Sequence, residues 1–450
     1  MALDCDAASD GRPGGLATPR FRAGPFTLTP IADTSARFSD FGPYVPSIDD
    51  NGVVAFQATL RAGGSGVFAG AGGPITTLAE STGSALHAVC SHPDINSAGF
   101  CCFYAELASG GCGAFLARRD ERTQLATSAG PLGPTMNEAG VVAFRAPLAR
   151  RGSEGAPLAG GASVDGEPDA RRAPGKSEPN HGACGIFTAG DGPVTMIATA
   201  APRASHAGRI VRAGSASGSG ASGGAAAGGR RFQAFHGLPV INSRGTVVFR
   251  ADLDDSRQGV FVSDGQRVIA VALTGERFVS LGAFPTLNDD GTVVFCGVER
   301  PAGVRGAGVL RGPQAPSPAF WSGQGFNPPG AAGGAAQASG GGVFIARDGH
   351  VSRALDTNGP FESFHGALID GMGRIVFYAT PRGAALGVFT GPDARASRLV
   401  SLGMELYGAA VVDFALNPVS INSAGQLAVR VRLEDQRQHV LRADPPAGVG

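Results

Sequence analysis

The stretch Pro239–Leu253, "PVINSRGTVVFRADL", places an isoleucine before the letters Asn-Ser-Arg-Gly and follows them with a dense apolar run. An asparagine side chain can bond to its own backbone two residues on, and glycine readily adopts a positive φ, so these letters predict a tight turn. The β-branched residues that come next predict a strand. The stretch therefore predicts a tight turn that leads into a strand.

Nearly the same word occurs seven times along the 450 residues. The copies begin at Ile48, Ile95, Met136, Ile241, Leu287, Ile369 and Ile421. A second motif of the form Gly-x-Phe follows each copy by about 17 residues or after an insertion. It begins at Gly66, Gly113, Gly185, Gly259, Gly342 and Gly387, with His439 in the last copy. In the fifth copy Gly308 also fits, but the distance to the next turn favours Gly342. A regular tandem repeat is typical of propellers and solenoids.

Each repeat contains four strand candidates, which we name a, b, c and d. In the fourth copy they read "GTVVFRADL", "GVFVSDG", "RVIAVAL" and "FVSLGAFPTL". The turn word joins strand d to the next strand a. About 45 residues with four antiparallel strands is the size of one β-propeller blade.

The two ends of the repeat array complement each other. Residues 26–48 form a c–d pair without a preceding a–b pair, and residues 425–445 form an a–b pair without a following c–d pair. We therefore predict an all-β fold, a seven-bladed β-propeller over residues 21–445. The ring would be closed by pairing of the N-terminal c–d strands with the C-terminal a–b strands, which leaves no open edge between blades.

Composition divides the rest of the chain. Residues 1–20 are predicted to be a disordered N-terminal segment, and low-complexity insertions are predicted at 150–182, 203–231 and 311–340. Such compositions bury too little apolar surface to offset the entropy of ordering. We interpret the insertions as tolerated surface variation, the alternative being a mobile rim around the mouth of the channel.

Charge and cysteine usage limit the function classes. The 37 basic and 37 acidic residues give a net charge of zero, which removes the electrostatic argument for nucleic acid or an anionic membrane as partner. No apolar run is long enough to predict a membrane span. No signal peptide is visible, so we expect a cytoplasmic protein, or an exported one if the true start lies upstream. Seven cysteines without a C-x-x-C motif favour free thiols.

Two groups of side chains are candidates for a metal ion. His87, Cys90 and His92 are soft zinc ligands, but their spacing matches no structural zinc motif, so we expect neither a metal nor another cofactor. Oxygen ligands suited to calcium occur in two turn words, although turns use the same residues without a metal. These are Asp49, Asp50, Asn51, Asn288, Asp289 and Asp290.

Two histidines, His236 and His365, occupy the same part of their repeats shortly before the turn word. They are the candidate ligand-binding residues. The alternative is that backbone groups near the turn satisfy their ring nitrogens.

The word Asn-x-x-Gly-x-x-x-Phe is complete at four sites and degenerate at Asp49, Asp370 and Asn422. The complete copies are Asn96–Phe103, Asn137–Phe144, Asn242–Phe249 and Asn288–Phe295. With this word the chain resembles the bacterial choice-of-anchor tandem-repeat NxxGxxxF family. The resemblance implies a repeat protein of uncharacterised function, typically exported and anchored, and it supplies no catalytic residues. This chain shows neither a signal nor an anchor.

We expect a binding or scaffold module, a monomer with an unknown protein or small-molecule partner. One alternative is a propeller hydrolase or lyase that uses Asp and His residues at the channel mouth. A second alternative is a structural protein of the cell surface. The fold by itself does not choose among these functions.

Overall fold

The computed structural model describes residues 21–446, except for 24, 120, 129, 131, 149–182, 191, 201–224, 227–229 and 301–340. Every regular element in the described residues is a β-strand. None of these residues forms a helix long and apolar enough to cross a membrane. The predicted segments 1–20, 150–182 and 311–340 lie outside the described residues. Of the predicted insertion 203–231, residues 225–226 and 230–231 belong to strands.

Seven a strands each pair in antiparallel fashion with a b strand. The a strands are β5 (Val54–Leu60), β10 (Cys101–Leu107), β14 (Val142–Pro147), β19 (Val247–Leu253), β24 (Val293–Glu299), β28 (Ile375–Pro381) and β33 (Leu427–Leu433). Their b partners are β6 (Ser65–Gly70), β11 (Cys112–Arg118), β15 (Cys184–Ala189), β20 (Gln258–Ser263), β25 (Gly341–Arg347), β29 (Gly387–Phe389) and β34 (Gln438–Asp444). The pairing of β24 with β25 confirms Gly342 as the start of the fifth b motif.

The c strands pair with the far edge of the b strands. They are β7 (Thr76–Glu80), β12 (Glu121–Ala126), β16 (Thr195–Ala200), β21 (Val268–Leu273), β26 (His350–Asp356), β30 (Arg398–Ser401) and β2 (Phe26–Asp33). Strand β2 therefore joins the sheet of β34, the last strand of the chain, as the sequence predicts for strand c.

The d strands pair with the a strand that follows them. They are β3 (Phe38–Asp40) with β4 (Ser47–Ile48), β8 (Leu86–Val89) with β9 (Asp94–Ile95), β13 (Thr135–Met136), β18 (Arg230–Ile241), β22 (Phe278–Leu281) with β23 (Thr286–Leu287), β27 (Phe361–Ile369) and β32 (Ala409–Ala415). The short strands β1 (Phe21–Ala23), β17 (Ala225–Ala226) and β31 (Glu405–Leu406) extend β2, β18 and β32.

This order corrects one part of the predicted closure. The N-terminal d strand, β3, does not join the C-terminal a–b strands but pairs with β5. The reason is the tight turn between d and a, because a short turn between antiparallel strands makes them sheet neighbours. Each unit therefore has the spatial order d–a–b–c.

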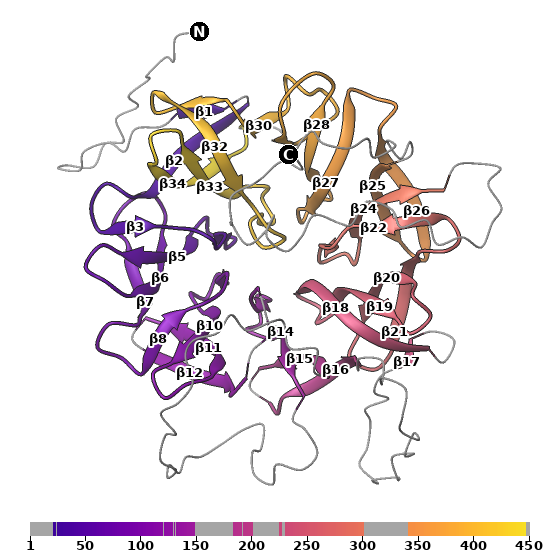
Figure 1. Ribbon diagram of the computed structural model, residues 1–450, viewed down its shortest axis with the longest axis horizontal. Coiled ribbons are helices and arrows are strands. Elements are labelled where there is room, and N and C mark those ends of the chain that lie inside the picture. The colour runs from indigo at the N-terminus through magenta and orange to yellow at the C-terminus, as the bar shows by residue number, and fades with distance from the viewer. Residues whose placement is uncertain are drawn as a thin grey trace, which may run out of the picture.

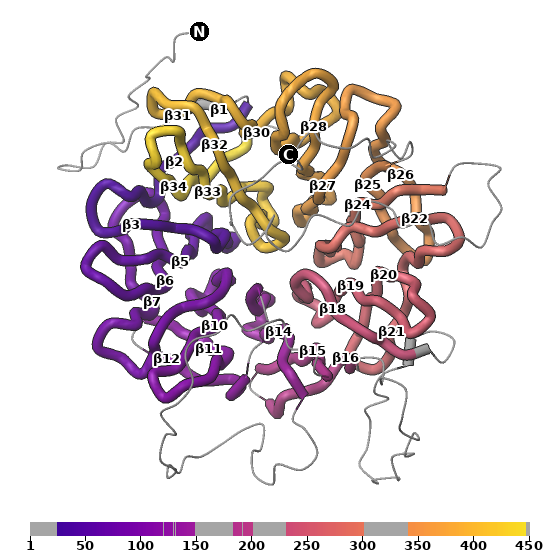
Figure 2. Tube along the Cα trace, in the orientation of Figure 1, coloured from indigo at the N-terminus to yellow at the C-terminus, as the bar shows by residue number. Residues whose placement is uncertain are grey.

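The units are arranged around a ring, as in a β-propeller (Figure 1). The chain passes once around this ring, so that its last sheet lies beside its first (Figure 2). Hydrogen bonds group the strands into six sheets, because the third and fourth units are joined by the parallel pair Ala200 and Phe232.

Apolar side chains fill the sheets and the spaces between them. Phenylalanines face each other across the a and b strands, for example Phe249 and Phe261, whose ring centroids lie 5.7 Å apart. Neighbouring units share hydrophobic clusters, and one cluster joins Ala428 and Val440 of the last unit to Phe56 of the first. The repeated phenylalanines are thus core residues.

The seven turns form a second set of contacts around the ring. In the fourth turn, the Asn242 Oδ1 atom accepts the backbone N–H of Thr246 at 2.9 Å, and Gly245 has a φ of +80°. The Asn242 Nδ2 atom donates to the backbone oxygen of Asn288, the matching residue of the next turn, at 3.0 Å. We call this series of turn-to-turn contacts the turn ring.

The same contact recurs at five of the seven joints. The pairs are Asn96 to Asn137, Asn137 to Asn242, Asn242 to Asn288, Asn288 to Asp370, and Asn422 to Asp49. Where the turn begins with aspartate, whose side chain has no N–H to donate, another side chain makes the link. Asn51 donates to Ser97 at 3.1 Å, and Arg374 donates to Ala424 at 2.7 Å. The seven links return to their starting turn.

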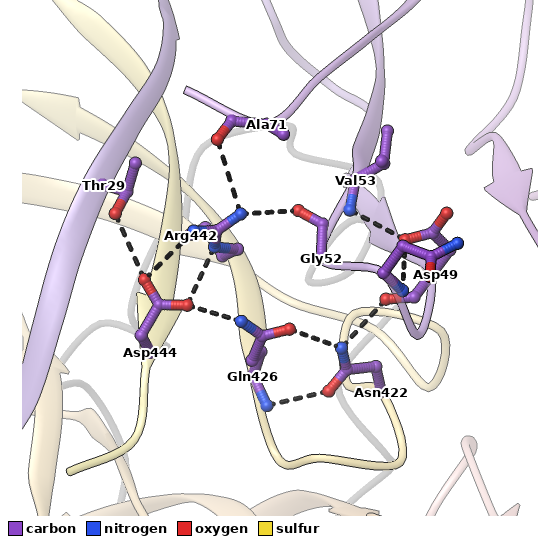
Figure 3. A network of polar contacts seen from close by, with 10 residues as sticks. Thr29, Asp49, Gly52, Val53, Ala71, Asn422, Gln426, Arg442 and Asp444 are labelled. Atoms are coloured by element: carbon purple, nitrogen blue, oxygen red, sulfur yellow. Dashed lines mark hydrogen bonds and ion pairs between the residues drawn. The ribbon is translucent and has the colours of Figure 1, made fainter. Parts of the chain in front are cut away.

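At the joint between the last and first units, further side chains form a network of polar contacts (Figure 3). Arg442 donates to the backbone oxygen of Gly52 at 2.8 Å and pairs with Asp444 at 2.9 Å. Gln426 bonds both Asp444 and Asn422, which links this network to the turn ring. Strands that are far apart in sequence are therefore held by side chains as well as by the β2–β34 pairing.

Candidate functional site

The candidate site is built around Arg250, in the middle of β19. Its side chain is only 5% exposed, and it stands opposite Val260 of β20. Among the described residues, its sole polar contact is with Asp252, whose Oδ1 lies 4.0 Å from Nη2. Its buried Nε has no hydrogen-bond partner there. A buried guanidinium normally uses its five donors in a fixed fork, so Arg250 presents unused donors.

His236 and Asp252 stand next to this arginine. His236, on β18, is the cross-strand partner of Arg250, and its Nε2 lies 2.9 Å from Oδ2 of Asp252. Both side chains are about one-third exposed. The other carboxylate oxygen of Asp252 is buried and has no hydrogen-bond partner in the described part of the chain. We call His236, Arg250 and Asp252 the Arg250 cluster.

The electrostatics of the cluster follow from burial and from the neighbours of each charged group. Burial lowers the pKa of Arg250, and the charge of Asp252 opposes this effect. For Asp252, burial acts to raise the pKa. The hydrogen bond and charge of His236, together with the charge of Arg250, outweigh burial and leave the pKa of Asp252 below its usual value. The carboxylate is therefore ionised and orients the imidazole of His236.

The backbone beside the cluster is tightly packed. Gly237 has a φ of +66°, and a Cβ atom there would overlap the carbonyl oxygen of Ala283 in the next unit. Arg145 of the preceding unit donates from Nη1 to the carbonyl oxygen of Gly237 at 3.2 Å. Three consecutive units thus fix the position of the segment that carries His236.

The second candidate histidine, His365, has a different partner set. It lies on β27, in a different sheet from His236, and its Nε2 is 2.9 Å from Oγ of Ser363 and 3.3 Å from Oγ1 of Thr380. Burial lowers its pKa. Both histidines are therefore held by side chains, His365 by hydroxyl groups and His236 by a carboxylate.

The predicted zinc candidates do not converge. His87 is exposed on β8, whereas His92 is buried and its Nδ1 accepts the backbone N–H of Val45 at 2.8 Å. The Cys90 sulfur lies 3.2 Å from the sulfur of Cys112. The described residues contain no group of three or more His, Cys, Asp or Glu side chains placed to hold a metal ion.

Of the acidic turn residues considered for calcium, Asp49, Asp50 and Asp289 accept backbone hydrogen bonds. Asp49 Oδ1 accepts the N–H groups of Asn51 and Val53, at 3.0 and 2.7 Å. Asp50 accepts the N–H of Ser423 in the last turn at 2.8 Å. These carboxylates act in turn formation and in the contacts between turns.

Sequence reasoning missed Arg250, although the signal was present. It follows the phenylalanine of the turn word, a position where the seven repeats differ. The residues there are Gln57, Tyr104, Arg145, Arg250, Cys296, Tyr378 and Arg430. The tyrosine hydroxyls bond backbone groups of the next unit, and Arg430 pairs with Asp413 at 2.8 Å. Arg250 alone among the three arginines donates no hydrogen bond within the described residues.

Comparison with known proteins gives a family and a fold. A family model described as a family of unknown function, DUF7453, matches residues 178–441, more than half of the chain. No curated protein matches the sequence.

Several solved structures are similar over most of the chain. Oligogalacturonate lyase from Vibrio parahaemolyticus is 11% identical, covers 100% of this chain and 99% of its own, and gives a TM-score of 0.48. The β-propeller domain of the Trilobed protease from Pyrococcus furiosus is 11% identical. The match covers 80% of this chain and 99% of that domain, with a TM-score of 0.33. TolB from Acinetobacter baumannii is 9% identical, with 93% and 80% covered and a TM-score of 0.36. At these TM-scores and identities, function has to be argued from the chain's own residues.

Proposed function

Because the chain belongs to DUF7453, a family of unknown function, we propose its function from its own fold and side chains. The protein is a closed seven-bladed β-propeller that acts as a binding module, and it takes an anionic group at the Arg250 cluster.

Three observations support seven blades in a closed ring. The described residues contain seven a–b pairs, and the turn ring links seven turns in a cycle. Strand β2 pairs with β34 along six positions, so the last unit obtains its fourth strand from the beginning of the chain. A crystal structure with six or eight blades would contradict this architecture.

The unused donors of Arg250 carry the proposed binding function. A buried guanidinium without acceptors loses its hydration and gains little in return, which is costly unless a ligand supplies the missing acceptors. Carboxylate and phosphate-like oxyanions match the planar fork of an arginine. His236 beside it, held by Asp252 at 2.9 Å, offers ring nitrogens as further polar contacts for a bound group.

The test compares the thermal midpoint of wild type, Arg250→Gln and Arg430→Gln in chloride, sulfate and acetate at equal ionic strength. Arg430 is the matched control, because it is buried at the same repeat position but already pairs with Asp413. Sulfate stabilises most proteins through exclusion from their surface, so only the difference between variants is informative. We expect at least one of the two probe anions to raise the midpoint of wild type and Arg430→Gln more than that of Arg250→Gln. Equal responses in all three proteins to both anions would contradict anion binding at Arg250.

A propeller hydrolase or lyase is the second candidate function, and the His236–Asp252 pair favours it. A carboxylate that holds one imidazole nitrogen is the arrangement of a general base. With 4-nitrophenyl acetate as probe ester, a hydrolase of this kind would lose turnover in His236→Ala, whereas a binding module would show only the background rate in both proteins.

Two further expectations remain predictions. The relation to choice-of-anchor NxxGxxxF proteins is supported by the recurring turn word. A structural role at the cell surface would require the native protein to be found outside the cell.

A further inference from the structure

Two cysteines of the second unit are in contact. The Cys90 and Cys112 sulfur atoms lie 3.2 Å apart. Cys90 directly follows β8, and Cys112 is the first residue of β11. Both strands pair with β10, which runs between them. The two thiols therefore meet across a strand, although they are 22 residues apart in the chain.

The surroundings set this pair apart from three of the other described cysteines, whereas Cys184 is half-buried as well. Cys90 and Cys112 are both free and half-buried. Cys101, Cys102 and Cys296 are buried among apolar side chains. Solution reagents can therefore reach Cys90 and Cys112 more readily than the three core thiols.

The geometry also supplies a nucleophile, and its partner lies in a segment between two strands. Cys90 begins the segment 90–93, which lies between strands β8 and β9 and is not itself a strand. A hydrogen bond between the two sulfurs lowers the pKa of Cys112 and raises the pKa of Cys90. Cys112 is thus the thiol that more readily becomes a thiolate, the form that attacks a disulfide.

We propose that Cys90 and Cys112 form a reversible dithiol–disulfide pair that exchanges with low-molecular-weight disulfides such as oxidised glutathione. Closing the bond requires the sulfur atoms to approach from 3.2 Å to about 2.05 Å.

The exchange proceeds in two balanced steps. The Cys112 thiolate attacks one sulfur of oxidised glutathione, forms a mixed disulfide and releases one glutathione thiolate. Cys90 then loses its proton to solvent and attacks the Cys112 sulfur, which forms the intramolecular bond and releases the second glutathione. Two protein thiols are oxidised, and one glutathione disulfide is reduced to two glutathione molecules.

Peptide mapping of the full chain tests the proposal directly. Cleavage after glutamate and before aspartate separates the cysteines, because Glu80, Asp94, Glu106 and Asp120 bound three fragments. Fragment 81–93 contains Cys90, fragment 94–106 contains Cys101 and Cys102, and fragment 107–119 contains Cys112. After oxidised glutathione and alkylation of the remaining thiols, we expect 81–93 joined to 107–119. The mass of the joined fragments should be lower than the sum of the two reduced fragments by two hydrogen atoms. Reduction should separate the two fragments.

Serine variants provide the controls. Cys90→Ser and Cys112→Ser should each lose the joined fragment, whereas Cys101→Ser should retain it. Far-UV circular dichroism checks that each variant is folded. The proposal is overturned if Cys90 and Cys112 are fully alkylated after oxidation, if a stable glutathione adduct accumulates, or if 107–119 is joined to 94–106.

Discussion

The turn ring predicts a specific effect of the change Asn242→Asp. Aspartate keeps the Oδ1 atom that accepts the N–H groups of Arg244 and Thr246, so the turn itself should form. It replaces the Nδ2 donor that bonds the backbone oxygen of Asn288 at 3.0 Å. The substitution therefore removes one turn-to-turn link without changing side-chain size.

The magnitude follows from the burial of both partners. Asn242 is 5% exposed, and the lost hydrogen bond is worth about 1 kcal/mol net. A carboxylate oxygen facing the orphaned carbonyl of Asn288 adds a desolvation cost of about 1–3 kcal/mol. We expect the free energy of unfolding to fall by about 2–4 kcal/mol.

The chain itself suggests a compensating change. In the first turn Asp49 occupies the asparagine position, and Asn51 makes the link two residues later. Arg244 is the equivalent of Asn51, and its ion pair with Asp290 is long, 3.7 Å, and exposed. Adding Arg244→Asn to Asn242→Asp should therefore restore about 1 kcal/mol of the lost free energy of unfolding. Arg244→Asn alone should lower the free energy of unfolding by no more than about 0.5 kcal/mol.

Urea unfolding followed by far-UV circular dichroism measures all four proteins. The reasoning would be refuted if Asn242→Asp unfolded within about 0.5 kcal/mol of wild type. A double variant no more stable than Asn242→Asp would refute the proposed compensation. A changed m-value would indicate a change in the unfolding mechanism rather than in one contact.

Two further predictions concern His92 and Gly237. Burial lowers the pKa of His92 to about 3, below the unfolded value of about 6.5, so protons favour the unfolded chain as the pH falls below about 6.5. Between pH 8 and pH 5 this residue should lower the free energy of unfolding of the wild type by about 2 kcal/mol. Urea unfolding at both pH values should show a loss for His92→Gln that is smaller by about this amount. An equal pH dependence in the variant would contradict the assignment. Gly237→Ala should cost about 3 kcal/mol, because its Cβ would overlap the carbonyl oxygen of Ala283 at a positive φ. The matched change Gly245→Ala, at a φ of +80° with open space around it, should cost only about 1 kcal/mol, and equal thermal midpoints would count against the packing argument.

The repeated word predicted much of this fold because the same local physics acts at each copy. Turn formers such as Asn242 and Gly245 are satisfied within a few residues, so their role is readable from the chain. The order d–a–b–c was missed at the N-terminus, where β3 pairs with β5. A repeat of the sequence runs from strand a to strand d, whereas a sheet combines strand d of one repeat with strands a, b and c of the next.

The site was less predictable for a physical reason. His236 could be selected from its position, but its partner Asp252 is 16 residues away and becomes a neighbour only through strand pairing. Arg250 looks like an ordinary strand residue until it is known to donate no hydrogen bond to the described part of the chain. Cys112 likewise gains its partner through the two strands that flank β10. Pairings of this kind depend on register, which the repeat spacing alone does not give.

The pairing of β2 with β34 has a consequence for synthesis on the ribosome. Thr29 and Asp444, which bond each other across these strands, are 415 residues apart. At ordinary translation speeds the first strand is made roughly 20–80 s before its partner. Throughout that interval β2 exposes an unpaired edge that another nascent chain can occupy. Production of the protein should therefore depend on chaperones that shield this edge until β34 emerges.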